Sequence, residues 1–268
     1  MKRGFILNGS IFFDEIKAVV KSQPIWMMLG TQDIKLRYRR SAIGPFWITI
    51  SMAITIYTMG FLYGYLFKVN QENYMPYLAT GVIAWSFIST LIVEGSQVFV
   101  EAENYIRNQD CFMSIFIMRI ILRNSIILLH NLLVFIPILF IYHINPGPQM
   151  LLLIPGVIFI GINAFLWGTL SGMLGARFRD FYQIITSLVQ VVFFLTPIMW
   201  MTDSLPERLH WIVDYNPFNQ FINLIRQPLL NHTISLHTLT VVTVISCIGF
   251  LIYACSMMKY KHRIVFWL

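Results

Sequence analysis

Six long runs of apolar residues, separated by shorter polar segments, dominate this sequence. Each run is about 20 residues long, which is the length that an α-helix needs to cross the hydrocarbon core of a bilayer. The pattern therefore predicts an all-α integral membrane protein with six transmembrane helices. We expect these spans at residues 45–67, 75–99, 124–142, 150–175, 182–201 and 238–258.

The amino-acid composition fits this membrane architecture. Apolar residues make up 57% of the 268 positions and charged residues only 12%, which is about half the charged share of a soluble globular domain. A single soluble core of this size cannot bury so much apolar surface. The three cysteines are an odd number, and Cys247 and Cys255 lie in an apolar run. We therefore expect neither a disulfide framework nor a metal site.

Lysine and arginine are distributed very unevenly between the two sides of the predicted bundle. Of the 19 lysines and arginines, eight precede the first span and three lie in the tail. Three more lie in the connection between spans two and three, and two lie in the connection between spans four and five. The opposite side has only Lys68, Arg208 and Arg226. Because cytoplasmic loops are enriched in lysine and arginine, this bias predicts that both termini are cytoplasmic. The net charge of +7 is then mainly a topology signal, and it requires no nucleic-acid partner.

The segment before the first span has the pattern of a helix at the membrane surface. Residues 24–40 begin with a proline, continue through apolar residues that include Trp26, and end in a basic cluster. Proline suits a first helical turn, and the mixture of tryptophan, leucine and basic residues is typical of an amphipathic helix in the interface. We therefore divide the chain into a cytoplasmic segment, residues 1–44, and a six-span domain, residues 45–268.

Residues 202–237 are too polar to span the membrane and too apolar for an ordinary loop. Ser204 and Glu207 have the spacing of a capping box, and Asn216 stands before Pro217, a favourable cap before a favourable first helical residue. The segment therefore predicts two short re-entrant helices between spans five and six, dipping into the outer face of the membrane.

Sequence motifs for enzymatic chemistry are absent. There is no G-x-x-x-x-G-K-[ST] loop to hold ATP phosphates, and no H-E-x-x-H, C-x-x-C or G-x-S-x-G motif. Glu94 is the only carboxylate well inside a predicted span, so the spans offer it no second acid for acid/base catalysis. We therefore expect a non-catalytic chain with no catalytic residue, metal or cofactor of its own.

Two of the predicted spans have faces that contact with lipid alone does not explain. At about 100° per residue, aromatic residues of the first span share a third of its circumference, and polar residues with one aromatic share a similar arc of the fifth. Aromatic rings beside amides and hydroxyls suit a sugar chain, which has apolar faces and hydroxyl rims. Alternatively, the aromatics form lipid-facing belts and the glutamines bond between helices. The candidate channel residues are Phe46, Trp47, Tyr57, Phe61, Tyr65, Gln183, Ser187, Gln190 and Phe194.

Several short motifs give the chain a resemblance to a known family. They are L-R-Y-R-R-S-A-I-G-P-F-W at residues 36–47, R-D-F-Y at 179–182, L-T-P-I at 195–198 and Y-N-P-F at 215–218. In their order and spacing they resemble the permeases of ABC-type polysaccharide exporters, and with the six-span layout the resemblance covers nearly the whole chain. The family exports O-antigen, capsule and teichoic-acid polymers.

The resemblance implies partners and roles. Two copies of the permease would form a channel in the bacterial inner membrane, driven by two cytoplasmic ABC ATPase subunits that bind the ATP. The region 100–118 would couple to the ATPase, and the two short helices near 205–229 would gate the outer mouth. The implied coupling residues are Glu101, Glu103, Tyr105 and Arg107, and the implied gate residues are Pro206, Trp211, Asn216, Pro217 and Phe218.

The coupling loop departs from the family pattern in one place. The segment N-Y-I-R-N at residues 104–108 fits, but Phe112 and Met113 stand where phenylalanine and proline are usual. This difference leaves the end of the coupling helix open. The importer-type motif, E-A-A followed by a spaced glycine, is not met at residues 101–103, which favours an exporter.

Three functional hypotheses follow. The first is the membrane half of an exporter that moves a lipid-linked polysaccharide, O-antigen in the first place, from the cytoplasm across the inner membrane. The second is the same architecture with another cargo, such as capsule, teichoic acid, a drug or a small lipid. The third is a multi-span membrane transferase, which needs clustered acids or histidines near one membrane face; the sequence has no such cluster.

Overall fold

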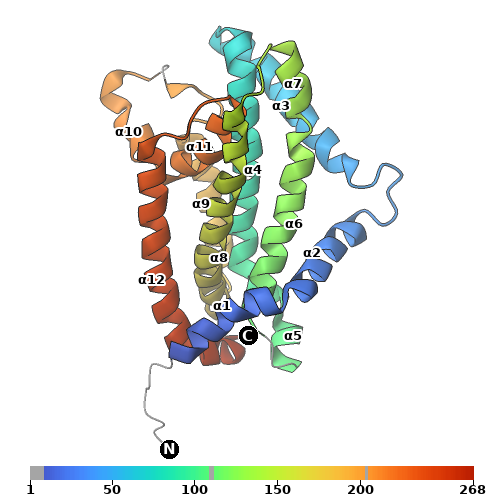
Figure 1. The fold of residues 1–268 in the computed structure, drawn as a ribbon, viewed down its shortest axis with the longest axis vertical. Helices are drawn as coiled ribbons and strands as arrows, with labels where there is room; N and C mark the ends of the chain where they lie inside the picture. The colour runs from blue at the N-terminus through green and yellow to red at the C-terminus, as the bar shows by residue number, and fades with distance from the viewer. Residues whose placement is uncertain (1–8, 109–111, 203–204) are drawn as a thin grey trace, which may run out of the picture.

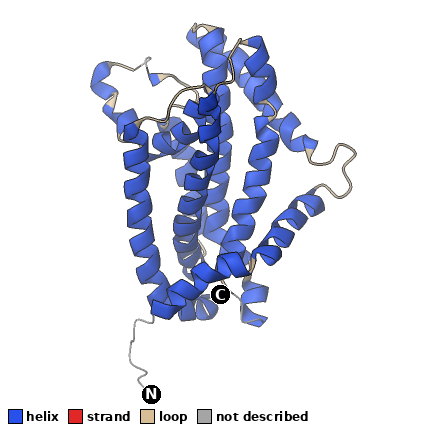
Figure 2. Cartoon of the chain, viewed as in Figure 1, coloured by secondary structure: helices blue, strands red, loops and turns tan. Residues whose placement is uncertain are grey.

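The structure is a computed structural model that describes residues 9–108, 112–202 and 205–268. Within these ranges every regular element is a helix (Figure 2). Five helical stretches are long and apolar enough to cross a membrane, which confirms an all-helical, multi-span architecture. They are Phe46–Leu66, Gln71–Asn108, Ser114–Ile141, Pro148–Arg177 and Leu236–Trp267.

The helices form an upright bundle with one helix lying across its lower end (Figure 1). We call the end that holds α1, α5 and the C-terminus the base, and the opposite end, with η1 and α10, the distal end. In chain order the elements are α1 (Gly9–Lys21), α2 (Gln23–Arg37), α3 (Phe46–Phe67), α4 (Gln71–Glu101), α5 (Glu103–Asn108), α6 (Ser114–Leu132), α7 (Phe135–Ile141), η1 (Pro148–Leu152), α8 (Leu153–Arg177), α9 (Phe181–Leu195), η3 (Glu207–Leu209), α10 (Trp211–Asp214), α11 (Pro217–Leu229) and α12 (Leu236–Trp267).

The fifth predicted span forms a helix that is shorter than expected. α9 has 15 residues, about 22 Å of helix, against the ~30 Å thickness of the hydrocarbon core. It ends at Leu195 because Pro197 follows, and the residue before a proline is disfavoured in the helical conformation. Residues 196–201 continue the apolar run without forming a regular helix.

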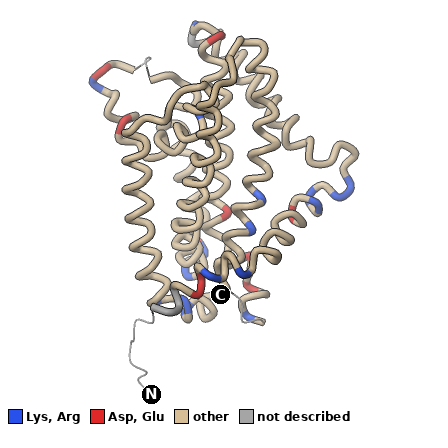
Figure 3. The backbone as a smooth tube through the Cα atoms, in the orientation of Figure 1, with Lys and Arg blue, Asp and Glu red and all other residues tan. Residues whose placement is uncertain are grey.

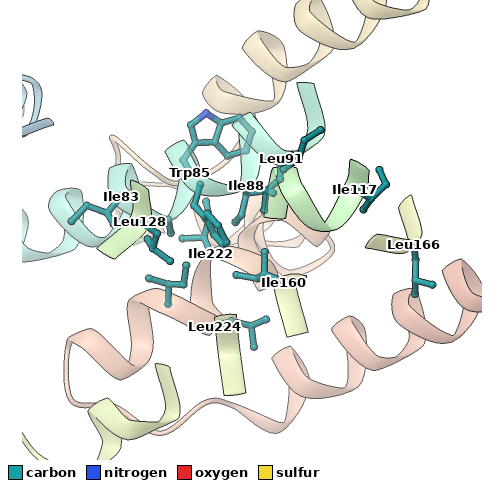
Figure 4. Packing of buried hydrophobic residues seen from close by; sticks show 14 of the residues in the cluster. Ile83, Trp85, Ile88, Leu91, Ile117, Leu128, Ile160, Leu166, Ile222 and Leu224 are labelled. Carbon is teal, nitrogen blue, oxygen red and sulfur yellow. The ribbon is translucent and has the colours of Figure 1, made fainter. Parts of the chain in front are cut away.

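α4 is the central helix of the bundle. It packs against α3, α6, α8, α9 and α11, and 67% of its most apolar stretch is buried, compared with 11% for α3. Ile88 of α4, Ile160 of α8 and Ile222 of α11 converge in the core (Figure 4). α3 is therefore a peripheral helix, and α4 is the one around which the others are arranged.

Small residues allow α4 and α8 to approach closely. A Cβ atom added to Gly95 of α4 would lie 3.1 Å from the Gly168 Cα of α8, and one added to Gly172 would lie 3.0 Å from the Gly95 carbonyl oxygen. Any larger side chain at these positions would push the helices apart. Close backbone approach of this kind is a main source of helix association in lipid.

The third span begins earlier than the sequence pattern predicts. The expected start was residue 124, but α6 begins at Ser114 and brings Arg119 and Arg123 into the helix. Both side chains have ionic partners on neighbouring helices. Because those partners neutralise the two charges, the helix tolerates both arginines. The hydropathy pattern alone places them outside the span.

Candidate functional site

A network of ion pairs joins α2, α6 and α4. Asp33 of α2 lies 2.6 Å from Arg119 Nη2 and 3.0 Å from Arg123 Nη1, both on α6. Arg123 Nη2 lies 2.8 Å from Glu94 Oε2 on α4, and Asn124 Nδ2 donates to the same oxygen at 2.5 Å. The Arg123 side chain is only 11% exposed. It is therefore the shared cation of two carboxylates, and it connects the peripheral α2 to the central helix.

Sequence reasoning missed this network, although it left a signal. Arg119 and Arg123 are four residues apart and therefore lie on one face of a helix. An arginine pair on one face beside a lone intramembrane carboxylate, Glu94, points to mutual neutralisation. The role of Asp33 was not visible, because only the fold brings α2 against α6.

The start of α6 is capped by a carboxylate from α1. Glu15 is fully buried and accepts hydrogen bonds from the backbone N–H groups of Ser114, at 3.0 Å, and Met113, at 3.4 Å. Its Oε1 atom also lies 2.7 Å from Lys261 Nζ on α12. Met113 occupies the N-cap position but has no side-chain acceptor for the free N–H groups. An anion at the positive end of the helix dipole supplies what the local sequence lacks.

The predicted coupling residues lie together at the base. Glu101 ends α4 and is exposed, and α5 begins two residues later. Within α5, Arg107 Nε lies 2.9 Å from Glu103 Oε1, a pair one helical turn apart. The Tyr105 side chain is 48% exposed, and its ring lies 6.0 Å from that of Phe116 on α6. The four residues therefore form one charged, accessible helical corner.

A buried arginine fixes the distal end of α9. Arg226 of α11 donates from Nη2 to the Pro197 carbonyl at 2.8 Å, and the Tyr77 hydroxyl of α4 donates to the same oxygen at 2.9 Å. The Arg226 guanidinium also lies 3.9 Å from the centre of the Tyr77 ring. Burial lowers the pKa of Arg226, and the neighbouring Tyr77 opposes that shift. The two donors satisfy a carbonyl that the helix break at Thr196 leaves without a helical partner.

The predicted gate residues are spread over three distal elements. Asn216 caps α11 as predicted: its Oδ1 accepts the Phe218 N–H at 2.9 Å, and Pro217 follows it at the first helical position. Phe218 packs its ring 6.1 Å from that of Trp85. Trp211, at the start of α10, is 58% exposed. Pro206 is exposed before η3.

One residue of the predicted capping box cannot be compared with the structure. Ser204 lies outside the described residues, so its pairing with Glu207 stays a prediction. Glu207 itself begins the short η3 helix. Among the described residues between α9 and α12, the regular elements include η3, α10 and α11, and the two re-entrant helices stay a prediction.

The aromatic arc of α3 is mostly exposed in the single chain. Phe46, Trp47, Phe61 and Tyr65 are 51–68% exposed, and Phe61 and Tyr65 pack edge to face with ring centres 4.9 Å apart. Tyr57 differs from the others, because it is half-buried and its hydroxyl donates to the Val134 carbonyl at 3.3 Å. The structure therefore places four of the five rings on an open surface and the fifth against the α6–α7 junction.

The polar arc of α9 is also open. α9 has no buried residue, and Gln183, Ser187, Gln190 and Phe194 are all exposed. α3 and α9 both pack on α4, and no extended contact joins the two helices within the described ranges. The single chain therefore presents the two arcs without bringing them together.

The amino-acid sequence is similar to those of known transport proteins. Residues 25–230 match the sequence profile of a family described as ABC-2 type transporter. The chain is 23% identical over 239 residues to an O-antigen export system permease protein, RfbA, of Klebsiella pneumoniae, covering 88% of this chain and 92% of that protein. It is 19% identical over 197 residues to the protein of the same name from Myxococcus xanthus, covering 72% of this chain and 74% of that protein.

Proposed function

Since this chain belongs to the ABC-2 type transporter family, we propose that it is the membrane-spanning permease subunit of an ATP-driven exporter of lipid-linked O-antigen polysaccharide. The observation that carries this proposal is the similarity to O-antigen export permeases along nearly the full length of both chains. The cargo is moved from the cytoplasm across the inner membrane. The chain itself is non-catalytic, and a separate ATPase subunit hydrolyses the ATP.

The proposed topology has six crossings with both termini in the cytoplasm. α9 and the apolar residues 196–201 make the fifth crossing, and η3, α10 and α11 are the re-entrant elements after it. Two observations support this reading. Lys and Arg gather toward the base and in the α2–α3 connection (Figure 3), and α11 lies below the distal tip of α4 inside the bundle (Figure 1). The base is then the cytoplasmic end.

The proposed channel forms between two copies of the chain. The exposed amides of α9 are unsuited to bulk lipid, since a glutamine amide in hydrocarbon lacks hydrogen-bond partners. A second copy that covers both arcs would enclose them around a shared path. Rings and amides along that path give a glycan many weak contacts, and weak, multiple sites suit conduction because the cargo must also leave.

The proposed coupling site is the charged corner formed by Glu101 and α5. It lies at the base, where a cytoplasmic ATPase would dock, and its charges are accessible. α5 follows α4 after one residue, Ala102, and the ion-pair network joins α4 to α2 and α6. A displacement of α5 would therefore be passed to α4, on which the channel helices α3 and α9 pack.

Genetic removal and biochemical reconstitution test the proposal together. Deleting the gene should remove O-antigen from the cell surface and leave polymer inside the cytoplasm, and the intact gene should restore export. The purified chain should hydrolyse no ATP by itself and should co-purify as two copies with two ATPase subunits. Unchanged surface O-antigen in the deletion strain would refute O-antigen as the cargo. ATPase activity of the purified single chain would refute the proposal that a separate subunit hydrolyses the ATP.

A further inference from the structure

A long apolar slot runs along α8 between α9 and α12. Its floor is made by α8 and α4, its walls by α9 and α12, and Phe218 and Phe221 of α11 close its distal end. The volume of this slot is about 780 Å³. Most of its lining is aliphatic or aromatic, as with Ile92, Leu174 and Ile252. It is therefore a pre-formed site for a hydrocarbon chain.

The length of the slot argues for one long chain. Its lining residues on α8 extend from Ile160 to Arg177, a distance of about 25 Å at 1.5 Å per residue. One leaflet contributes only about 15 Å, half of the ~30 Å hydrocarbon core. A tail that fills the slot must therefore be longer than a leaflet is deep.

Unpaired cations surround the basal end of the slot. The Arg177 guanidinium lies 5.5 Å from the Trp267 ring, and Trp267 and Tyr260, 5.8 Å apart, both line the slot. Lys259 and Arg263 lie 5.1 and 5.9 Å from the Tyr260 ring. In the part of the chain that the structure describes, none of these three cations is in an ion pair. These three positive charges are complementary to the negative charge of a phosphate group bound at this end of the slot.

α9 separates the slot from the polar arc of the same helix. Phe181 and Ile185 line the slot, whereas Gln183 and Gln190 lie about 180° away from them on the helix circumference at 100° per residue. One helix therefore carries an apolar tail site on one side and sugar-compatible groups on the other.

We propose that the slot binds the lipid carrier of the exported polymer: its tail, longer than one leaflet, lies along α8, and its phosphate contacts Arg177, Lys259 and Arg263. The inference rests on the proposed function, because it concerns the lipid to which the exported glycan is joined. Tail and glycan would then occupy opposite faces of α9, with the phosphate at the base joining them.

Photocrosslinking of the full chain in nanodiscs tests the site. The probe is a long-chain polyprenyl phosphate that carries a diazirine in its tail, and the crosslinked residues are mapped by mass spectrometry. We expect crosslinks on the slot-lining residues of α8 and α12. Leu174→Trp, which fills the slot, should abolish them, whereas Ile162→Trp, on an exposed face of α8 outside the slot, should not.

Arg177→Gln should weaken probe binding about tenfold, as expected for losing one charge-assisted hydrogen bond, and Arg208→Gln, on the distal η3, should leave it unchanged.

Each competing outcome has a distinct result. Crosslinks spread evenly over all exposed apolar faces would mean ordinary bilayer contact and would overturn the proposal. Equal competition by phosphatidylglycerol would mean a phospholipid site and would also overturn it. Thermal unfolding of each variant in detergent identifies any variant that fails to fold. If Leu174→Trp does not fold, the comparison of Arg177→Gln with Arg208→Gln tests the site. If the slot binds no probe, but deleting the gene still abolishes export of O-antigen, this inference fails and the proposed function stands.

Discussion

The Glu15 carboxylate accepts a hydrogen bond from the Ser114 backbone N–H at 3.0 Å, although the two residues are 99 positions apart. The carboxylate is fully buried, and Lys261 balances its charge at 2.7 Å. One side chain of α1 thus satisfies the start of α6 and holds the end of α12. α12 also contacts α5, so these contacts lie beside the proposed ATPase-binding corner.

Replacing Glu15 by glutamine should destabilise the protein by about 3 kcal/mol, because removing one partner of a buried ion pair leaves the other uncompensated. We expect a lower midpoint of thermal unfolding in detergent. Asp14→Asn on the same helix is the matched control, since Asp14 is exposed, and it should unfold like the wild type. Combining Glu15→Gln with Lys261→Met should recover part of the loss; no recovery would mean that the ion pair is not the cause.

Arg123 should be more important for stability than Arg119. Arg123 contacts both Asp33 and Glu94, whereas Arg119 contacts Asp33 alone. We expect Arg123→Gln to cost about 2–4 kcal/mol, more than Arg119→Gln, and to be non-additive with Glu94→Gln in a double-mutant cycle. Arg107→Gln, which breaks only the exposed pair in α5, should cost under about 1 kcal/mol. Equal losses for the three arginine variants would contradict the network.

Reversing the charges of the coupling corner should uncouple ATP hydrolysis from export. In the triple variant Glu101→Lys, Glu103→Lys and Arg107→Glu, the pair within α5 is retained with its signs exchanged, so α5 itself should stay folded. We expect normal membrane insertion and thermal unfolding but lost export and weakened co-purification of the ATPase. Lys35→Glu on α2, also exposed, serves as a control for charge reversal alone. Normal export by the triple variant would place the docking site elsewhere.

Cysteine labelling should identify the channel wall. In a background without Cys111, Cys247 and Cys255, single cysteines at Phe61, Tyr65, Gln190 and Phe194 should react faster with a membrane-impermeant thiol reagent during export. The physical reason is that the reactive thiolate forms readily only in water. Cysteines at Ile154 and Leu251, which are 62% and 64% exposed but outside both arcs, should react slowly. Equal rates would indicate that the arcs contact lipid or pack helices.

Two variants of Asn216 should separate its two roles. Asn216 Oδ1 caps α11, and its Nδ2 donates to the Thr196 hydroxyl at 3.0 Å. Asn216→Ser retains a capping oxygen but loses the long donor, whereas Asn216→Ala loses both. We expect a stability loss of about 1 kcal/mol for alanine and little for serine, with export impaired in both if the bond to Thr196 positions the gate. Full export by the serine variant would confine Asn216 to a capping role.

The sequence predicted those features whose signal is local. The apolar runs locate five spanning helices, and the pair Asn216–Pro217 marks the start of α11 correctly. Pro197 is visible in the sequence too, and it ends α9 at 15 residues, short of a full crossing. Lipid-embedded helices tolerate proline only where neighbours satisfy the freed groups. Here the neighbours are Tyr77 and Arg226.

Features that depend on tertiary partners were not predictable. Arg119 and Arg123 were assigned to a loop because a count of apolar residues cannot include the carboxylates that neutralise them. Helical periodicity groups Tyr57 with the other rings of α3, yet its hydroxyl donates to the Val134 carbonyl at the α6–α7 junction and the side chain is half-buried. Helical periodicity predicts the direction in which a side chain leaves its own helix. The packing of the other helices decides whether that side chain meets protein, lipid or water.

The two ends of α9 are held very differently. At the distal end the Pro197 carbonyl takes two donors from buried or half-buried residues, while at the base only three residues, 178–180, join α9 to α8. The short backbone connection keeps the basal end of α9 beside α8, whereas the distal end is held by side-chain hydrogen bonds, which can break and re-form. We therefore expect any rearrangement of α9 during the proposed transport cycle to be larger at its distal end, beside the proposed gate.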